Sequence, residues 1–286
     1  MSKQPRKQMS ASNYLRLIKD AALAWDKHEA PRLGAALAFY TILSLSPLVI
    51  LILALMSLVV DRGSAQSEIV NQTKWLLGDK GSEAIQFLLR NNHQPSTGWI
   101  AWTVGVGTLL FGASGVFLEL RSALNKIWEV PASGTGRLQG FIREQFLSFG
   151  MVLTIGFLLL VSLLLSACLA AVGKFVGGLF IGSTFALNAI SFIAALLGIS
   201  VLFALIFKFV PAVEVQWRDV RLGAFLTALL FTLGKTLMAR YLGHSVGSPY
   251  GAAGSLIVVI AWVYYSAQIF FFGAEFTRVF SLRGKG

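Results

Sequence analysis

The sequence predicts an all-α integral membrane protein: a bundle of six transmembrane helices with amphipathic interfacial helices and both termini in the cytoplasm. The first observation behind this prediction is a run of 28 residues without a charged side chain, Leu33 to Val60. An α-helix rises about 1.5 Å per residue, so this run is long enough to cross a hydrocarbon core of about 30 Å. The second observation is composition, because charged residues make up 13% of this chain and about 25% of an average soluble domain.

The third observation is the uneven distribution of positive charge. Seventeen Lys or Arg residues fall in four segments: 1–32, 119–145, 208–221 and 276–286. Five fall in the three segments that six spans would place on the opposite side: 61–98, 173–183 and 242–254. Lys and Arg accumulate on the cytoplasmic side of membrane proteins. We therefore expect a multi-pass membrane protein with both termini in the cytoplasm.

Residues 1–32 are predicted to form a basic amphipathic segment on the cytoplasmic side. One face of a helix there carries its apolar side chains: Tyr14, Leu17, Ile18, Ala21 and Trp25. Basic side chains occupy much of the rest, which is typical of a helix lying among lipid headgroups. Nucleic-acid binding is the competing interpretation of this charge, but a topology with cytoplasmic termini requires the same charge.

The membrane domain is expected over residues 33–279, followed by a basic cytoplasmic tail at 280–286. The six spans are predicted at about 33–60, 99–118, 146–172, 184–207, 222–241 and 255–275. Each is a predominantly apolar segment of the length that a membrane helix requires. The last helix is expected to continue past Glu275 to Arg278.

Two connecting segments also predict helices. Residues 61–98 contain two short amphipathic pieces, Ser67–Leu77 and Ser82–Arg90, with a glycine-containing turn at 78–81 between them. A further helix is expected to leave the membrane at Glu119. Pro131 should stop it, because proline in a helix interior removes a backbone hydrogen bond.

Polar residues near the middle of the first and last spans form the candidate binding site. They are Tyr40, Ser44, Ser46, Pro47, Tyr265 and Gln268. If the two helices are neighbours, these groups form a polar centre at the depth where transporters hold cargo. The alternative interpretation is a proline kink whose freed backbone groups are satisfied by nearby hydroxyls.

Charged residues at the ends of the spans form a second candidate set: Glu119, Arg121, Lys235, Glu275 and Arg278. All except Lys235 are predicted at a similar cytoplasmic depth. They either lock the helices together as ion pairs or gate an entrance. Lys235 is expected in the outer half of the membrane, where it either extends to the surface or lines an aqueous cavity.

The sequence shows no metal-binding or nucleotide-binding pattern. Its three histidines, His28, His93 and His244, are predicted in separate loops, and the lone Cys168 lies in an apolar run. No HxxxH or CxxC spacing and no GxxxxGK[ST] phosphate loop occurs. We therefore expect a protein that is not an enzyme and that has no metal, no cofactor and no ATPase site.

Four stretches resemble the YihY/BrkB family of bacterial inner-membrane proteins, once labelled ribonuclease BN. They are Arg32–Leu48 (RLGAALAFYTILSLSPL), Glu119–Val130 (ELRSALNKIWEV), Phe209–Gly223 (FVPAVEVQWRDVRLG) and Tyr250–Glu275 (YGAAGSLIVVIAWVYYSAQIFFFGAE). The resemblance covers about residues 20–280 and implies six membrane helices, with no settled catalytic or binding residues to carry over. Some relatives are associated with serum resistance and others with export of lipid-like molecules. The resemblance thus implies translocation but no particular cargo.

These observations favour a transporter or a translocator of lipids or small molecules. The alternatives are a non-transporting membrane scaffold or envelope factor and, less favoured, a membrane-associated ribonuclease that processes tRNA. The expected partners are membrane lipids and a lipid or small-molecule cargo, with no specific nucleic acid. Small residues on the second span also permit a homo-oligomer.

Overall fold

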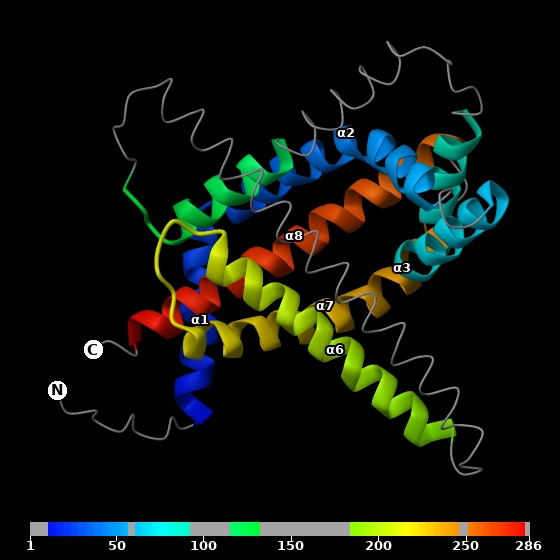
Figure 1. Ribbon diagram of the computed structural model, residues 1–286. Helices are drawn as coiled ribbons and strands as arrows, with labels where there is room; N and C mark the ends of the chain where they lie inside the picture. Colours follow the sequence, from blue (N-terminus) through cyan, green and yellow to red (C-terminus); the bar gives the residue numbers. More distant parts are fainter. Residues whose placement is uncertain (1–10, 57–60, 92–114, 132–183, 246–250, 284–286) are drawn as a thin grey trace. The chain divides into compact units, whose positions relative to one another are not determined.

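The computed structural model describes residues 11–56, 61–91, 115–131, 184–245 and 251–283. Every regular element in these ranges is an α-helix (Figure 1), which confirms the all-α prediction for this part of the chain. The labelled helices are α1 (Ala11–Lys27), α2 (Ala30–Met56), α3 (Arg62–Asn91), α6 (Thr184–Phe209), α7 (Trp217–Ser245) and α8 (Gly251–Arg283). A further helix covers residues 115–127.

Two described helices contain stretches long and apolar enough to cross a membrane. These stretches are Trp217–Met238 in α7 and Leu256–Arg283 in α8. Shorter apolar stretches lie in α2, at Ala30–Leu45, and in α6, at Ala195–Phe209. The predicted span at 146–172 and most of the predicted span at 99–118 lie outside the described residues. That the chain has six spans therefore stays a prediction.

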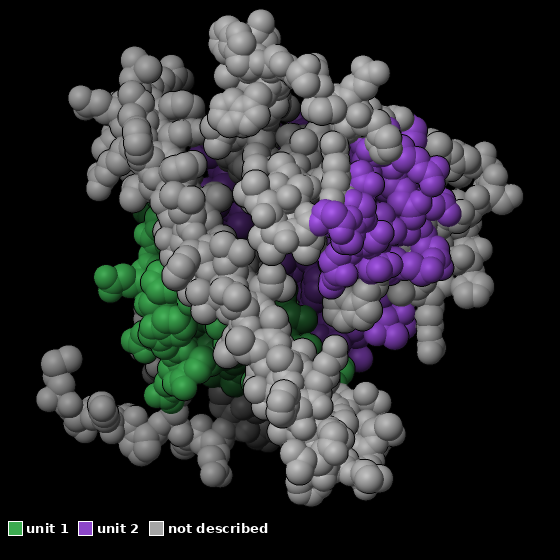
Figure 2. All heavy atoms as spheres, turned by 45° about the vertical axis from the view of Figure 1, so that its right-hand side comes forward, with its two compact units in different colours: residues 1–28, 121–230, 271–286 green, residues 29–120, 231–270 purple. Residues whose placement is uncertain are grey.

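The chain divides into two compact units, coloured separately in Figure 2. The first unit comprises residues 1–28, 121–230 and 271–286, and the second comprises residues 29–120 and 231–270. Each unit is therefore assembled from segments that are far apart in the sequence.

In the first unit, α1 packs against the C-terminal part of α8. Leu17 and Ala21 of α1 are fully buried and form a cluster with Phe276 and Phe280 of α8, whose rings stack at 6.4 Å. The sequence predicted a helix lying among lipid headgroups, and that location stays a prediction. Its apolar side chains Leu17 and Ala21 are covered by the aromatic surface of α8. Ile18, predicted on the same face, is 43% exposed.

Still in the first unit, α7 and α8 approach each other through a reciprocal pair of glycines and threonines. A methyl group at Gly223 of α7 would overlap the hydroxyl of Thr277 on α8, and one at Gly273 of α8 would overlap the hydroxyl of Thr227 on α7. Each threonine hydroxyl donates to the carbonyl of the glycine four residues earlier in its own helix, at 2.7 Å. Small residues let helix backbones come close in this way.

In the second unit, α3 packs against α2 as one bent helix. Val49 of α2 belongs to a buried cluster with Ala65, Ile69, Ile85 and Leu89 of α3. A straight helix would hold the first and last of these α3 residues about 36 Å apart, so α3 must bend to bring them together (Figure 1).

The prediction of two helices separated by a turn at 78–81 is therefore wrong in detail. One continuous helix, α3, covers residues 62–91, and the hydroxyl of Ser82 donates back to the carbonyl of Asp79 at 2.7 Å. Glycine in a helix costs about 1 kcal/mol, and packing of both halves of α3 in the cluster with α2 offsets that cost.

Candidate functional site: a buried histidine and carboxylate cluster

A buried contact between a histidine and a carboxylate lies where α1 ends. Helix α1 ends at Lys27, and the next residue, His28, has a side chain that is 7% exposed. Its Nδ1 lies 2.5 Å from Oε1 of Glu275 on α8, whose side chain is completely buried. Since 246 residues separate the two along the chain, only the tertiary fold brings them together.

The third member of the cluster, Glu129, stands at the end of the helix over residues 115–127. The backbone there forms a Schellman cap: the N–H of Val130 donates to the carbonyl of Asn125 at 2.9 Å, and the N–H of Glu129 donates to that of Lys126 at 3.1 Å. Glu129 has the left-handed backbone conformation, with a φ of 50°. Glycine is usual at this position, so the chain accepts some backbone strain to place a carboxylate here.

Three side chains contact the carboxylate of Glu129 as hydrogen-bond or ion-pair partners. Nζ of Lys27 donates to its Oε1 at 3.0 Å, and Nε2 of His28 lies 3.3 Å from the same oxygen. The guanidinium of Arg278 on α8 lies 2.6 Å from its Oε2. The hydrogen bonds from Lys27 and His28 and the charge of Arg278 together lower the pKa of Glu129 from 4.5 to about 2. Glu129 is therefore a stable anion at neutral pH.

We refer to His28, Glu129, Glu275, Arg278 and Lys27 as the His28 cluster. It joins the end of α1, the C-terminal part of α8 and the end of helix 115–127, and all five of its residues belong to the first unit. Both nitrogens of the imidazole face carboxylates, and Oε2 of Glu275 has no hydrogen-bond partner among the described residues. A buried carboxylate is costly unless it is paired or protonated, so the cluster is a place where a proton can be held.

A second set of hydrogen bonds fixes the helix that carries Glu129. Oδ1 of Asn125 accepts from the backbone N–H of Ala212 at 2.9 Å, which ties helix 115–127 to the loop between α6 and α7. The same loop is closed by Lys208, whose Nζ donates to the carbonyl of Val215 at 2.5 Å. These bonds hold the end of the helix and thereby help to orient the carboxylate.

The structure brings together part of the charged set that the sequence selected. Glu275 and Arg278 both belong to the His28 cluster, but they meet through His28 and Glu129, which sequence reasoning did not select. Arg121 lies in the same unit, and its Nε and one terminal nitrogen are buried without a hydrogen-bond partner among the described residues. Glu119 belongs to the other unit.

The sequence contains a partial indication of the two residues that sequence reasoning did not select, His28 and Glu129. Glu129 comes just before Pro131, where a helix must end, and a charged side chain at a helix end can face neighbouring helices. Glu275 and Arg278 are three residues apart and so share one face of α8. What the sequence lacks is any indication that the histidine after α1 meets that face.

The predicted mid-membrane residues of α2 and α8 contact three different partners. Gln268 packs against α2, since a methyl group at Gly34 would overlap its amide nitrogen. The ring of Tyr40 lies against Gly115, and that of Tyr265 lies against Gly234 of α7, at 2.7 Å from a Cβ built there. Helices α2 and α8 are thus in contact at Gly34, which lies about three helical turns before Ser44 of the predicted polar group.

Two further observations concern this polar set. The amide nitrogen and oxygen of Gln268 are buried with no hydrogen-bond partner among the described residues. Ser44 is buried, and its hydroxyl donates to the carbonyl of Thr41 at 2.9 Å within its own helix. The side chains of Ser46 and Pro47 lie outside the described residues.

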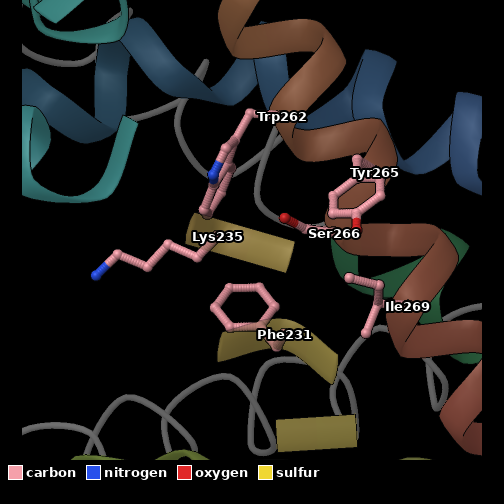
Figure 3. Close-up of a pocket in the computed structure, with 6 residues that line it drawn as sticks. All are labelled: Phe231, Lys235, Trp262, Tyr265, Ser266 and Ile269. Atoms are coloured by element: carbon pink, nitrogen blue, oxygen red, sulfur yellow. The ribbon is translucent and has the colours of Figure 1, made fainter. Parts of the chain in front are cut away.

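Lys235 lines a shallow hollow between α7 and α8 in the second unit (Figure 3). The other lining residues are Phe231, Trp262, Tyr265, Ser266 and Ile269. The hollow measures about 170 Å³ including its open side, and it has essentially no room for a water molecule. In Figure 3 the amino group of Lys235 points away from Tyr265 and Ser266. The rings of Phe231 and Trp262 meet edge to face at 6.0 Å.

One pattern in the sequence required the structure for its interpretation. Residues 243–247 read Gly-His-Ser-Val-Gly, which fits the GxSxG pattern of serine hydrolases. That pattern places its serine on a sharp turn between a strand and a helix. Here the described residues before the serine form the long helix α7, which ends at Ser245, where the elbow would require a strand. Within the described residues, no group of three or more His, Cys, Asp or Glu side chains is placed to hold a metal ion.

Comparison with known proteins also indicates a membrane protein. The family model described as "Virulence factor BrkB" matches residues 21–286. A UPF0761 membrane protein of Psychromonas ingrahamii is 30% identical over 84% of this chain and 79% of its own length. Another, of Mannheimia succiniciproducens, is 26% identical over 89% of this chain and 86% of its own.

A third relative, a UPF0761 membrane protein of Pseudoalteromonas atlantica, is 30% identical, and the match covers 62% of this chain and 57% of that protein. The chain thus spans little more than half the length of some relatives. No solved structure matches this chain significantly. Because the family model covers nearly the whole chain, this membrane protein belongs to the virulence factor BrkB family.

Proposed function

We propose that this protein is a transporter of the bacterial inner membrane that moves a lipid or a small molecule and has no ATPase of its own. It would cross the membrane six times with both termini in the cytoplasm, as the distribution of positive charge predicts. Its partners would be membrane lipids and the cargo itself. A carrier requires no catalytic group, and we propose no enzymatic role.

The observation that carries this proposal is the unpaired amide of Gln268. It is buried against α2, in contact with Gly34, and neither its nitrogen nor its oxygen has a hydrogen-bond partner among the described residues. Leaving a buried polar group unpaired costs about 1–3 kcal/mol. An apolar side chain of similar size would avoid that cost. A polar group of the cargo, or water that accompanies it, would supply the missing hydrogen bonds.

The test is transport by the purified protein in lipid vesicles, with fluorescent phospholipids and small solutes as probes. We expect Gln268→Leu to lower the rate by about tenfold, equal to about 1.4 kcal/mol for one lost hydrogen bond. Thr41→Val is the matched control, because its hydroxyl already donates to the carbonyl of Leu37 at 2.8 Å. A folded Gln268→Leu variant with the full rate would contradict the proposal.

The alternative function is a membrane scaffold that transports nothing. The absence of room for water in the hollow at Lys235 and the close packing of α7 on α8 in the first unit favour it. The vesicle assay separates the two functions. A scaffold would show no transport above protein-free vesicles for any probe, and Gln268→Leu would then change nothing.

A further inference from the structure

We propose that His28 and Glu275 form a proton-binding site that holds one exchangeable proton between Nδ1 and Oε1. The site goes beyond the proposed transport, and its test does not depend on transport. Its basis is the 2.5 Å separation of two atoms that are both acceptors when unprotonated, in side chains that are 7% and 0% exposed.

The distance itself requires a proton. A neutral imidazole carries one N–H and one lone pair, and an ionised carboxylate carries only lone pairs. Without a proton between them, two lone pairs would face each other at 2.5 Å. With one proton, the contact is a short charge-assisted hydrogen bond, whether the proton resides on the imidazole or on the carboxyl.

The other nitrogen of the imidazole determines which proton is exchangeable. Nε2 of His28 lies 3.3 Å from Oε1 of Glu129, which is ionised because its pKa is about 2. Nε2 is therefore a donor and keeps its own hydrogen. The proton between Nδ1 and Glu275 is the one that can leave.

The charged groups around the site do not replace that proton. Those that act on Glu275 are His28, Arg278 on the same helix and Glu129 from the end of helix 115–127. Arg278 is already paired with Glu129 at 2.6 Å, and Lys27 of α1 pairs with the same carboxylate at 3.0 Å. Loss of the proton would thus leave a buried carboxylate facing a lone pair, and this would weaken the attachment of the end of α1 to α8.

This site predicts a specific dependence of stability on pH. In the unfolded chain a glutamate releases its proton near pH 4.3 and a histidine near 6.5. Above about pH 6.5, the proposed site in the folded protein therefore holds one proton more than the same two side chains hold in the unfolded chain. The equilibrium constant for folding should then fall about tenfold for each pH unit, until the site itself loses its proton.

The experiment is reversible unfolding of the full chain in mixed micelles, between about pH 6.5 and 9. Glu275→Gln donates an amide hydrogen to Nδ1 and needs no exchangeable proton, so the tenfold dependence should disappear. The matched control is Asp20→Asn, which removes a different ion pair between α1 and α8, that of Asp20 with Arg283. It should lower stability and leave the pH dependence unchanged. An equal dependence in the original protein and in Glu275→Gln would overturn the proposal.

A second measurement covers the case in which Glu275→Gln does not fold. The chain has three histidines, so the double variant His93→Gln/His244→Gln leaves His28 as the only imidazole for nitrogen NMR. A hydrogen-bonded proton at Nδ1 that persists through the same pH range supports the site. An Nδ1 signal that titrates like that of an exposed histidine refutes it.

Discussion

The contact between α7 and α8 makes a sharp prediction, because two glycines there admit no side chain. In Gly223→Ala, the new methyl group would overlap the hydroxyl of Thr277, and it would also lie 2.9 Å from Cβ and 3.3 Å from Cα of that residue. Rotation of the threonine side chain removes only the first clash. The remaining contacts include a backbone atom, so the two helices must move apart.

The magnitude follows from two opposing effects. Overpacking of a close contact costs about 1–3 kcal/mol. The cost at Gly223 should lie at the upper end of this range, because the added methyl group would also meet the Cα of Thr277. Replacing glycine by alanine in a helix contributes about 1 kcal/mol in favour of folding. We therefore expect Gly223→Ala to lower the free energy of unfolding by about 2 kcal/mol, measured by reversible unfolding in mixed micelles.

The chain supplies its own controls for this prediction. Among the described residues, nothing outside the adjoining backbone of α6 lies within 4 Å of a Cβ built on Gly198, so Gly198→Ala should be neutral or slightly stabilising. Gly273→Ala meets only side-chain atoms of Thr227 among its nearest contacts, and truncation of that threonine to alanine should recover part of its loss. If Gly223→Ala proves as stable as Gly198→Ala, the close approach of α7 and α8 is refuted.

Three further predictions concern the end of helix 115–127. Glu129→Gln should lower the free energy of unfolding at pH 7 by about 1–2 kcal/mol, because three partners lose their anion. Its control is Asp79→Asn, which removes an exposed ion pair with Lys74 and should change the free energy of unfolding much less. The contribution of Glu129 to the free energy of unfolding should be complete above pH 4.5 and lost as the pH falls toward about 2, since folding lowers the pKa of this carboxyl from 4.5 to about 2. If Glu129→Gln still differs in stability from the original protein at the acid end of this range, the prediction is contradicted. Asn125→Ala should cost about 1 kcal/mol by leaving the N–H of Ala212 without its acceptor, and thermal unfolding that matches the original protein would exclude that role.

Local sequence pattern was sufficient for the helices themselves. Apolar length predicts the segments that become α2, α6, α7 and α8, and a proline predicts the end of helix 115–127. Membrane helices satisfy their backbone hydrogen bonds within one segment. Each helix is therefore a local property of its residues, which a sequence reveals without knowledge of its neighbours.

Contacts between distant segments needed the tertiary structure. Leu17 and Ala21 form an apolar face of α1. The sequence alone cannot show whether lipid headgroups or α8 cover this face. The bend in α3 is similar, because Gly78 and Gly81 permit either a turn or a continuous helix and packing in the cluster with α2 decides between them.

The candidate site shows the same division. The sequence alone determined that Glu275 and Arg278 share a face of α8 and that polar groups there would need partners. It did not determine that His28 and Glu129 are those partners. His28 lies 247 positions before Glu275, and Glu129 lies 149 positions before Arg278, its ion-pair partner. Hydrogen bonds and ion pairs act over a few ångströms in space, whereas a sequence orders residues only along the chain, so the meeting of these side chains was decided by the fold.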